Sequence, residues 1–224
     1  MRKVPSYLKE TDAWSTVLFA DPLGIHLARL LSHTPIHPNV VTIASLVPAL
    51  ACTYFFWRGD SLSLIWGALL FQLSWILDCT DGKLAKMTGK QTEFGTKLDP
   101  KIDFVRKLLT LAALTWGIYR QFGIIWLFVT LGGVMFHYGI HFVAHHTPPR
   151  IRQKEIPQVP AEGRLIRRAG QLYTAYDEQF FILFLGPALA WLTSHLPTYV
   201  IWGASLLYAI TILIIKIQMK QRGR

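Results

Sequence analysis

The chain has 224 residues, of which 52% are hydrophobic and only 16% carry a formal charge, and its mean hydropathy is +0.33. A soluble domain carries roughly 25% charged residues, so this composition excludes an ordinary soluble fold as well as intrinsic disorder. The net charge of +10 belongs to an apolar chain. We therefore assign it to loops that face anionic lipid, and we do not expect nucleic acid as a partner. These features predict an integral membrane protein.

Residues 1–37 form an N-terminal segment ahead of the first long apolar run. No signal peptide is expected there, because charged residues interrupt any apolar core: Lys9, Glu10 and Asp12. Apolar and charged residues mix between Ser6 and Leu31, which predicts one or two amphipathic helical segments at the membrane interface. We expect Asp21-Pro22 to break this region into two.

Residues 38–218 are expected to form an all-α core of six transmembrane helices, and the whole chain, 1–224, a single domain. Uncharged runs locate the helices, since a crossing needs about 20 apolar residues. The runs are Leu30–Trp57 (spanning from Asn39), Ser61–Leu77, Leu108–Tyr119 (extended back to Ile102), Gln121–Pro149 and Gln179–Ile215. The last run is long enough for two helices, and Ser194–Pro197 is the turn that divides it.

The basic residues predict the orientation of these helices. If the N-terminus is cytoplasmic, the outer loops hold only Arg58 and Arg120, and the other 21 of the 23 Lys and Arg residues lie inside. Cytoplasmic loops carry such an excess of positive charge. We therefore expect a multi-pass protein with both termini and the functional site on the cytoplasmic side.

Four aspartates lie where the second predicted helix meets the third. Asp78 and Asp81 are three residues apart, and Asp99 and Asp103 are four apart, so each pair shares one face of its helix. We expect Pro100 in the first turn of the third helix, where its missing N–H costs nothing. Two helices joined by a short loop can therefore aim four carboxylates at one point.

Ligands that are all oxygen, with no His or Cys among them, suit Mg²⁺ or Mn²⁺, and such ions complete their shells with phosphate oxygens. Gly82 and Ala85 continue the Asp78/Asp81 face with almost no side chain, which leaves room for a flat group to approach. Together these features predict a nucleotide diphosphate substrate at the membrane surface. Solvated helix-end carboxylates are the structural alternative, but ionisable residues that enter apolar spans favour a functional site.

Around these residues the sequence resembles the CDP-alcohol phosphotransferases. The family pattern D-x2-D-G-x2-A-R-x8-G-x3-D-x3-D is matched at its spacing by Asp78, Asp81, Gly82, Ala85, Gly95, Asp99 and Asp103. Lys86 departs from the pattern, because it stands where the family has Arg and lacks the planar fork of a guanidinium. Pro38–Thr42 is similar to the P-N-x-x-T sequence that opens the first helix of the family.

The resemblance implies a homodimer in phospholipid synthesis, in which an acceptor hydroxyl attacks the β-phosphorus of a CDP-alcohol and CMP leaves. CDP-diacylglycerol is the donor we expect. By the same resemblance, two divalent ions would be held by four residues: Asp78, Asp81, Asp99 and Asp103. Asp103 would also act as the base. The nucleotide would be bound by Asn39, Thr42, Asp78, Asp81, Gly82, Ala85, Lys86 and Gly95.

Two further groups of residues have weaker patterns. His137, His141 and His145 are four apart, with His146 beside the last, and could line the acceptor pocket or bind a metal. No carboxylate lies at a matching spacing, so interfacial histidines are the simpler interpretation of the stripe, with His141 as a candidate acceptor contact.

The polar stretch between His145 and Gly170 contains the second group, which shares one helical face: Arg164, Arg167 and Arg168. We expect these to bind a phosphate on the acceptor, although a cationic loop resting on anionic lipid is the alternative. The residues that follow, Tyr176, Asp177 and Glu178, start the fifth helix, where the acidic pair is expected to favour the helix dipole. A polar contact to the acceptor is the alternative.

Three other functions stay open at this point. A CDP-choline or CDP-ethanolamine transferase would place the lipid on the acceptor side, and a related enzyme would make a soluble phosphodiester. A divalent-cation carrier would need acidic residues near mid-membrane on several helices, and this chain has none there. The sequence does not identify the acceptor alcohol.

Overall fold

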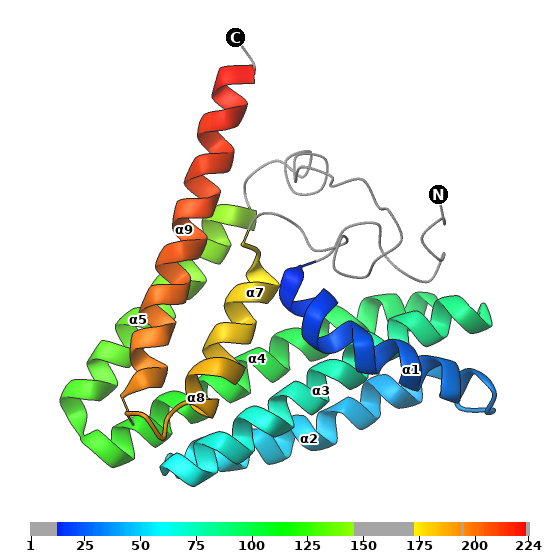
Figure 1. The fold of residues 1–224 in the computed structure, drawn as a ribbon, viewed down its shortest axis with the longest axis horizontal. Coiled ribbons are helices and arrows are strands. Elements are labelled where there is room, and N and C mark those ends of the chain that lie inside the picture. The colour runs from blue at the N-terminus through cyan, green and yellow to red at the C-terminus, as the bar shows by residue number, and fades with distance from the viewer. Residues whose placement is uncertain (1–12, 146–172, 194, 223–224) are drawn as a thin grey trace.

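The computed structural model describes residues 13–145, 173–193 and 195–222, and within these ranges the regular structure is helical, without strands. The elements in order are η1 (Thr16–Ala20), α1 (Asp21–Ser32), α2 (Pro38–Arg58), α3 (Ser61–Thr88), α4 (Glu93–Phe122), α5 (Ile124–His145), α7 (Ala175–Phe180), η3 (Phe181–Leu185), α8 (Gly186–Ala188) and α9 (Leu196–Arg222) (Figure 1).

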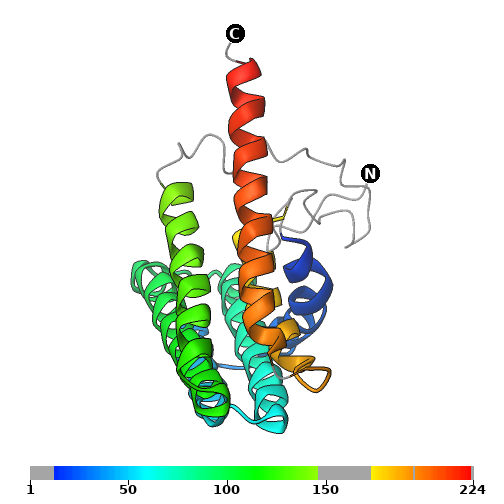
Figure 2. The ribbon, with the colours of Figure 1, turned by 90° about the vertical axis from the view of Figure 1, so that its left-hand side faces the viewer.

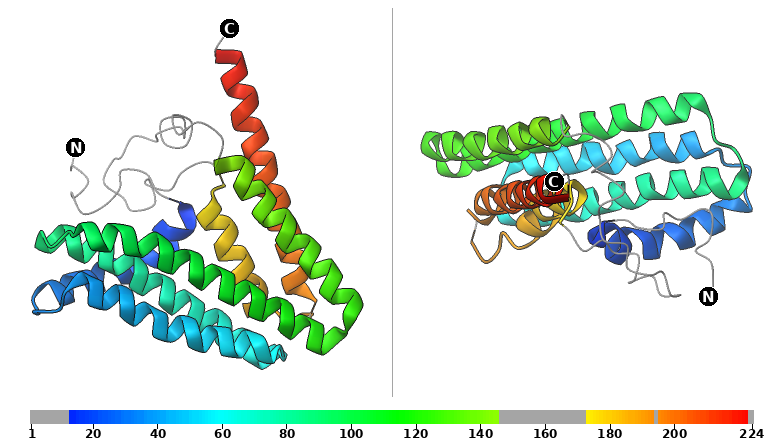
Figure 3. Two further views of the ribbon diagram at one scale, coloured as in Figure 1. Left: turned by 180° about the vertical axis from the view of Figure 1, so that it is seen from behind. Right: turned by 90° about the horizontal axis from the view of Figure 1, so that it is seen from above.

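The helices form two groups. Seen from above, α4, α2, α3 and α1 lie side by side in that order (Figure 3). The second group is the pair α5 and α9, which stand next to each other and lean away from the first group (Figures 1 and 2). The run from α7 through η3 to α8 packs against both α3 and α9. Residues of α4, α5, α7 and η3 line one partly open cavity.

One apolar core joins the two groups. Phe56, Phe71 and Leu114 from the first group pack with Ile182 of η3 and Ile201 of α9, and each of these five side chains is buried. The far end of α2 touches α4 backbone to backbone, because a Cβ on Gly117 would lie only 2.1 Å from the carbonyl oxygen of Phe56. Glycine at 117 is what permits this approach.

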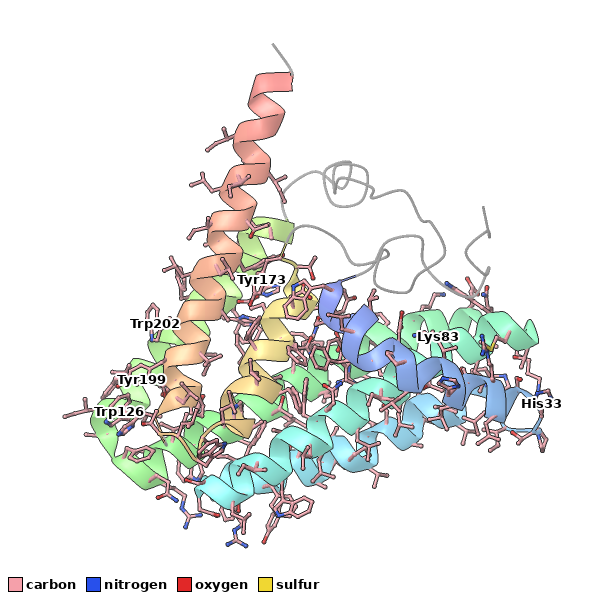
Figure 4. The ribbon with its side chains drawn as sticks, viewed as in Figure 1. His33, Lys83, Trp126, Tyr173, Tyr199 and Trp202 are labelled. Atoms are coloured by element: carbon pink, nitrogen blue, oxygen red, sulfur yellow. The ribbon has the colours of Figure 1, made fainter. Side chains whose placement is uncertain are left out.

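The α5–α9 pair is held by polar contacts as well as by packing. The hydroxyls of Thr130 and Thr198 lie 2.9 Å apart, and Trp202 Nε1 donates to the carbonyl of Val129 at 3.0 Å. Trp126 and Tyr199 add an edge-to-face contact near the same end of the pair (Figure 4). Small hydroxyls and aromatic N–H groups serve as such links where no water can replace them.

Short polar residues begin the helices of the first group. The side chains of His37, Asp60 and Thr92 accept backbone N–H groups at the starts of α2, α3 and α4. Asp60 accepts both the hydroxyl and the N–H of Ser63, at 2.6 Å and 3.0 Å. These hydrogen bonds, the hydroxyl's first, hold the pKa of the Asp60 carboxyl below its usual value.

Two local expectations were wrong. Pro100 lies inside α4 and not in its first turn, because the Thr92 cap starts that helix at Glu93. Asp21-Pro22 does not break the N-terminal helix, since η1 continues directly into α1 with helical backbone at Asp21. Pro22 stands in the first turn of α1, directly after η1, whose last hydrogen bond runs from the N–H of Asp21 to the carbonyl of Thr16.

Within the part of the chain that the structure describes, four helices are long and apolar enough to cross a membrane: α2, α3, α5 and α9. The other two expected spans are helical but differ from these. The first half of α4 is charged, and the run Ala175–Ala188 has 14 residues, about 21 Å at 1.5 Å per residue. The division of the last apolar run is confirmed, since α9 begins at Leu196.

Candidate functional site

We define the carboxylate cluster as Asp78, Asp81, Asp99 and Asp103. The side chains of Asp78, Asp81 and Asp103 lie where contacts join α2, α3 and α4. Asp78 and Asp81 are on α3 and Asp103 is on α4, as the spacing predicts. Thr42 of α2 donates its hydroxyl to Asp81 Oδ2, which ties the opening of the first long helix to the cluster. Asp99 is on α4, but its side chain lies outside the described part of the chain.

A buried arginine joins two of these carboxylates. Arg106 is only 2% exposed, and its guanidinium donates to Asp78 Oδ1 at 3.1 Å and to Asp103 Oδ1 at 2.6 Å. Lys107 Nζ lies 2.6 Å from the other oxygen of Asp103. One guanidinium that reaches both carboxylates holds Asp78 of α3 close to Asp103 of α4.

The predicted nucleotide residues gather at this same end of the bundle. A Cβ on Gly95 would lie 2.8 Å from Asn39 Oδ1, so the start of α4 packs directly on Asn39 of α2. Gly82 is exposed on α3, and nothing lies within 4 Å of where its Cβ would be. Ala85, one turn further along α3, is half-buried, and Lys86 is exposed. The face of α3 beside Asp81 is therefore open.

A cavity of about 270 Å³ adjoins the cluster between α4, α5 and α7. Its lining includes six polar residues: Asp103, Lys107, His137, Tyr138, His141 and Gln179. Tyr138 Oη and Gln179 Nε2 are buried and lack a hydrogen-bond partner among the described residues. Buried polar atoms of this kind are normally satisfied by water or by a ligand.

On the other side of this cavity, two histidines share one carboxylate. His137 Nδ1 and His141 Nε2 lie 2.8 Å and 2.7 Å from the two oxygens of Glu178, whose side chain is fully buried. The interpretation of the stripe as interfacial histidines is therefore incomplete, because α7 supplies the carboxylate that is missing from the local sequence. The side chain of His145 and the whole of His146 lie outside the described residues.

Asp177 and Glu178 do more than favour the helix dipole. Asp177 forms a capping box with Thr174, and its Oδ1 accepts the backbone N–H and the hydroxyl of Ser15 at 2.9 Å and 2.6 Å. This contact attaches the N-terminal segment to the start of α7. Lys83, labelled in Figure 4, makes a second attachment, since its Nζ lies 2.7 Å from Asp21 of α1.

Sequence reasoning missed Arg106 and Lys107 as members of the site, and it considered Glu178 as an alternative acceptor contact but not as the partner of the histidines. Arg106 and Lys107 are three and four residues after Asp103, so the helical spacing already placed them on its face. No comparable signal existed for Glu178, which is 37 residues from His141 in the chain. The predicted acceptor arginines, Arg164, Arg167 and Arg168, lie outside the described residues.

The chain is similar to known proteins over most of its length. A sequence profile described as CDP-alcohol phosphatidyltransferase matches residues 35–215. A cardiolipin synthase (CMP-forming) from Streptomyces coelicolor is 28% identical over 186 residues, which cover 78% of this chain and 81% of that protein. The crystal structure of Mycobacterium tuberculosis phosphatidylinositol phosphate synthase with CDP-DAG bound shares the fold, with a TM-score of 0.60. That match has 19% sequence identity and covers 86% of this chain and 90% of the other.

Proposed function

Because the chain belongs to the CDP-alcohol phosphatidyltransferase family, it is a CDP-alcohol phosphotransferase, and we propose that it uses CDP-diacylglycerol as donor. Two contacts beside the open face at Gly82 carry this proposal: Thr42 of α2 holds Asp81 of α3, and Arg106 of α4 holds both Asp78 and Asp103. The solved neighbour with CDP-DAG bound and the relative named as CMP-forming support the choice of donor and of leaving group.

The proposed reaction exchanges one P–O bond for another. The oxygen of an acceptor hydroxyl forms a bond to the β-phosphorus, and the bond from that phosphorus to the oxygen bridging the two phosphates breaks. CMP leaves with the bridging oxygen, and the hydroxyl proton passes to a base on the enzyme. The remaining task of the protein is to position the reactants and to stabilise the charge on the phosphates.

The carboxylate cluster suits divalent ions, which we propose as Mg²⁺ or Mn²⁺, one or two per site. Its donors are oxygens from adjacent helices, and Arg106 already orients Asp78 and Asp103 toward each other. When bound, such ions would neutralise the diphosphate and stabilise the attacking and leaving oxygens. We propose Asp78, Asp81, Asp99 and Asp103 as the ligands.

We propose that the donor lies against the open face of α3. Gly82 and Ala85 leave space for the nucleotide next to Asp81, and the exposed Lys86 can reach a phosphate as a point charge. The opposite side of the proposed donor-binding site is formed by Asn39, Thr42 and Gly95. Asn39 packs on Gly95, and Thr42 holds Asp81. These contacts orient the donor without contributing to its chemistry.

Asp103 is the base we propose for the acceptor hydroxyl. It belongs to the cluster and also lines the 270 Å³ cavity, so it can meet a donor on one side and an acceptor on the other. Arg106 and Lys107 each hold one of its oxygens, which keeps the carboxylate ionised and oriented. Within the cavity, His141 and the unpaired atoms of Tyr138 and Gln179 are available to bind acceptor hydroxyls.

We further propose six crossings, with α4 and Ala175–Ala188 joining the four apolar helices. In this arrangement η1 and α1 lie at the cytoplasmic interface, next to the site, and both termini are cytoplasmic. The phosphate-binding role of Arg164, Arg167 and Arg168 and the homodimer stay predictions. If the arginines act as proposed, a phosphorylated polyol drives CMP release better than the same polyol without its phosphate.

The experiment that tests the function is CMP release by the purified chain from CDP-diacylglycerol with a panel of acceptor alcohols. Asp103→Asn should reduce the rate by about 10²–10⁴, the range typical for a lost general base. Glu93→Gln is the matched control, because Glu93 is an exposed carboxylate on the same helix. If Asp103→Asn releases CMP as fast as Glu93→Gln does, Asp103 is not the base. If the wild type releases CMP from CDP-choline and not from CDP-diacylglycerol, the proposed donor is wrong.

A further inference from the structure

Glu178 is a buried carboxylate whose charge needs a partner. Its side chain has no exposed surface, and its two oxygens each face one imidazole nitrogen, of His137 and of His141. Among the described residues, no lysine or arginine forms an ion pair with it. An ionised carboxylate without compensation is costly inside a protein, so a proton or another cation has to accompany this group.

The three side chains have the arrangement of a metal site. Their donor atoms all lie within 4.8 Å of one another. His137 and His141 are four residues apart on α5, the spacing by which one helix presents two imidazoles to a zinc ion. Two histidines and one glutamate are also a known three-residue ligand set for catalytic zinc, which keeps its fourth position for water or substrate.

The free position of such a site would face the cavity. His137 and His141 both line the 270 Å³ space, whereas Glu178 lies behind them in α7. Asp103 lines the same space from α4. A ligand in the cavity would therefore have access to the histidines on one side and to the carboxylate cluster on the other.

We propose that His137, His141 and Glu178, hereafter the histidine site, bind a borderline transition-metal ion of the Zn²⁺ class with one coordination position open to the cavity. Imidazole nitrogen favours such ions, whereas the oxygen-only donors of the carboxylate cluster favour Mg²⁺ or Mn²⁺. The protein would thus hold two kinds of metal in neighbouring sites. This proposal concerns binding and holds whether or not the proposed donor is correct.

The test uses the full chain in detergent, stripped with a chelator and then given Zn²⁺ in the presence of excess Mg²⁺. After gel filtration, mass spectrometry should find about one Zn²⁺ per chain, and Co²⁺ should give the visible absorption of a four-coordinate ion. X-ray absorption of the zinc-loaded wild type should show imidazole scattering. A wild type without retained Zn²⁺, or a shell of oxygen alone, overturns the proposal and leaves a hydrogen-bonded His–Glu–His group.

Variants locate the ion. His141→Asn should lose the Zn²⁺, because it removes one ligand from a side chain that is only partly buried. His26→Asn is the matched control, since His26 is an exposed histidine on α1. Asp78→Asn should keep the Zn²⁺, because Asp78 belongs to the carboxylate cluster. If His141→Asn retains Zn²⁺, the assignment is contradicted. This holds most clearly if Asp78→Asn loses the ion instead.

Discussion

The carboxylate cluster and the histidine site lie on two sides of one cavity but are built in opposite ways. The members of the cluster come from two consecutive helices and lie within 26 residues of sequence. Two cations of α4, Arg106 and Lys107, neutralise part of its charge. The histidine site joins α5 to α7 across a separation of 37 to 41 residues, and the side-chain partners of its carboxylate among the described residues are two imidazoles. The first is encoded by local spacing, and the second exists only after the helices have packed.

The difference also separates two kinds of chemistry. Oxygen ligands next to an open helix face suit a hard ion and a diphosphate, whereas mixed nitrogen and oxygen ligands suit a borderline ion. Asp103 is the residue that connects the two, because it belongs to the cluster and lines the cavity. A substitution in the carboxylate cluster should therefore change transfer of the phosphate group without changing metal binding at the histidine site.

The largest effect is expected from Asp78→Asn. Loss of a metal ligand removes roughly 4 kcal/mol of transition-state stabilisation, so CMP release should fall by about a thousandfold. Zn²⁺ binding at the histidine site should stay at the wild-type level, which would show that the two sites are separate. Activity of Asp78→Asn within threefold of Glu93→Gln would contradict the role of the cluster.

The second prediction concerns the buried cation of the cluster. Arg106→Met leaves Asp78 and Asp103 without their shared guanidinium, and breaking a buried pair from one side costs about 3–5 kcal/mol. The midpoint of thermal unfolding in detergent should drop, and Mg²⁺ should restore part of the loss by replacing the missing charge.

The control for this prediction is Lys97→Met, which removes an exposed ion pair with Glu93 on the same helix. Exposed pairs contribute about 0–1 kcal/mol, so this variant should unfold near the wild-type temperature with or without Mg²⁺. Equal midpoints for Arg106→Met and Lys97→Met would mean that the cluster does not depend on its internal cation.

A third, smaller effect should come from the open face of α3. Gly82→Ala adds a Cβ that meets no protein atom within 4 Å, so the fold should be unharmed and the helix slightly favoured. If the donor lies there, its KM should rise about tenfold, or roughly 1.4 kcal/mol. Gly139→Ala is the control, because that glycine on α5 also has open space around it. An unchanged donor KM in Gly82→Ala would move the donor elsewhere.

Much of the carboxylate cluster could be predicted because helical spacing is a local property. The i, i+3 and i, i+4 rows placed Asp78 with Asp81 and Asp99 with Asp103 before any packing was known. The same spacing places Arg106 on the face of Asp103. Its contact with Asp78 could not be predicted, because that contact depends on how α3 and α4 are arranged. For the six apolar or partly apolar segments, the sequence predicted the positions of the helices well and their ends less well.

The spacing of His137 and His141 allowed a metal or pocket role, but the carboxylate that completes the histidine site could not be predicted, for a physical reason. A stripe of His137 and His141 on one helix can face lipid, water or a partner, and only the docking of α7 decides among these. Glu178 looked like an ordinary acidic residue in a first helical turn, a place where the helix dipole alone can account for it. Asp177 does have a local role, since it caps the start of α7. The next residue, Glu178, instead contacts His137 of α5.

The smallest effect is expected at Lys86, where the chain departs from the family pattern. Lys86 is exposed, so a contact from its ammonium to a donor phosphate would be partly screened by solvent and salt. Lys86→Ala should raise the donor KM by about threefold to tenfold, a loss of roughly 1 kcal/mol, with the effect shrinking at high salt. Lys86→Arg should keep the wild-type donor affinity, because the positive charge is kept and the planar fork of the guanidinium is added. Lys90→Ala, at another exposed lysine just beyond α3, should leave the donor KM unchanged. If Lys86→Ala also leaves it unchanged, the ammonium points to water or lipid, and the donor is held by the carboxylate cluster and its ions without help from this side chain.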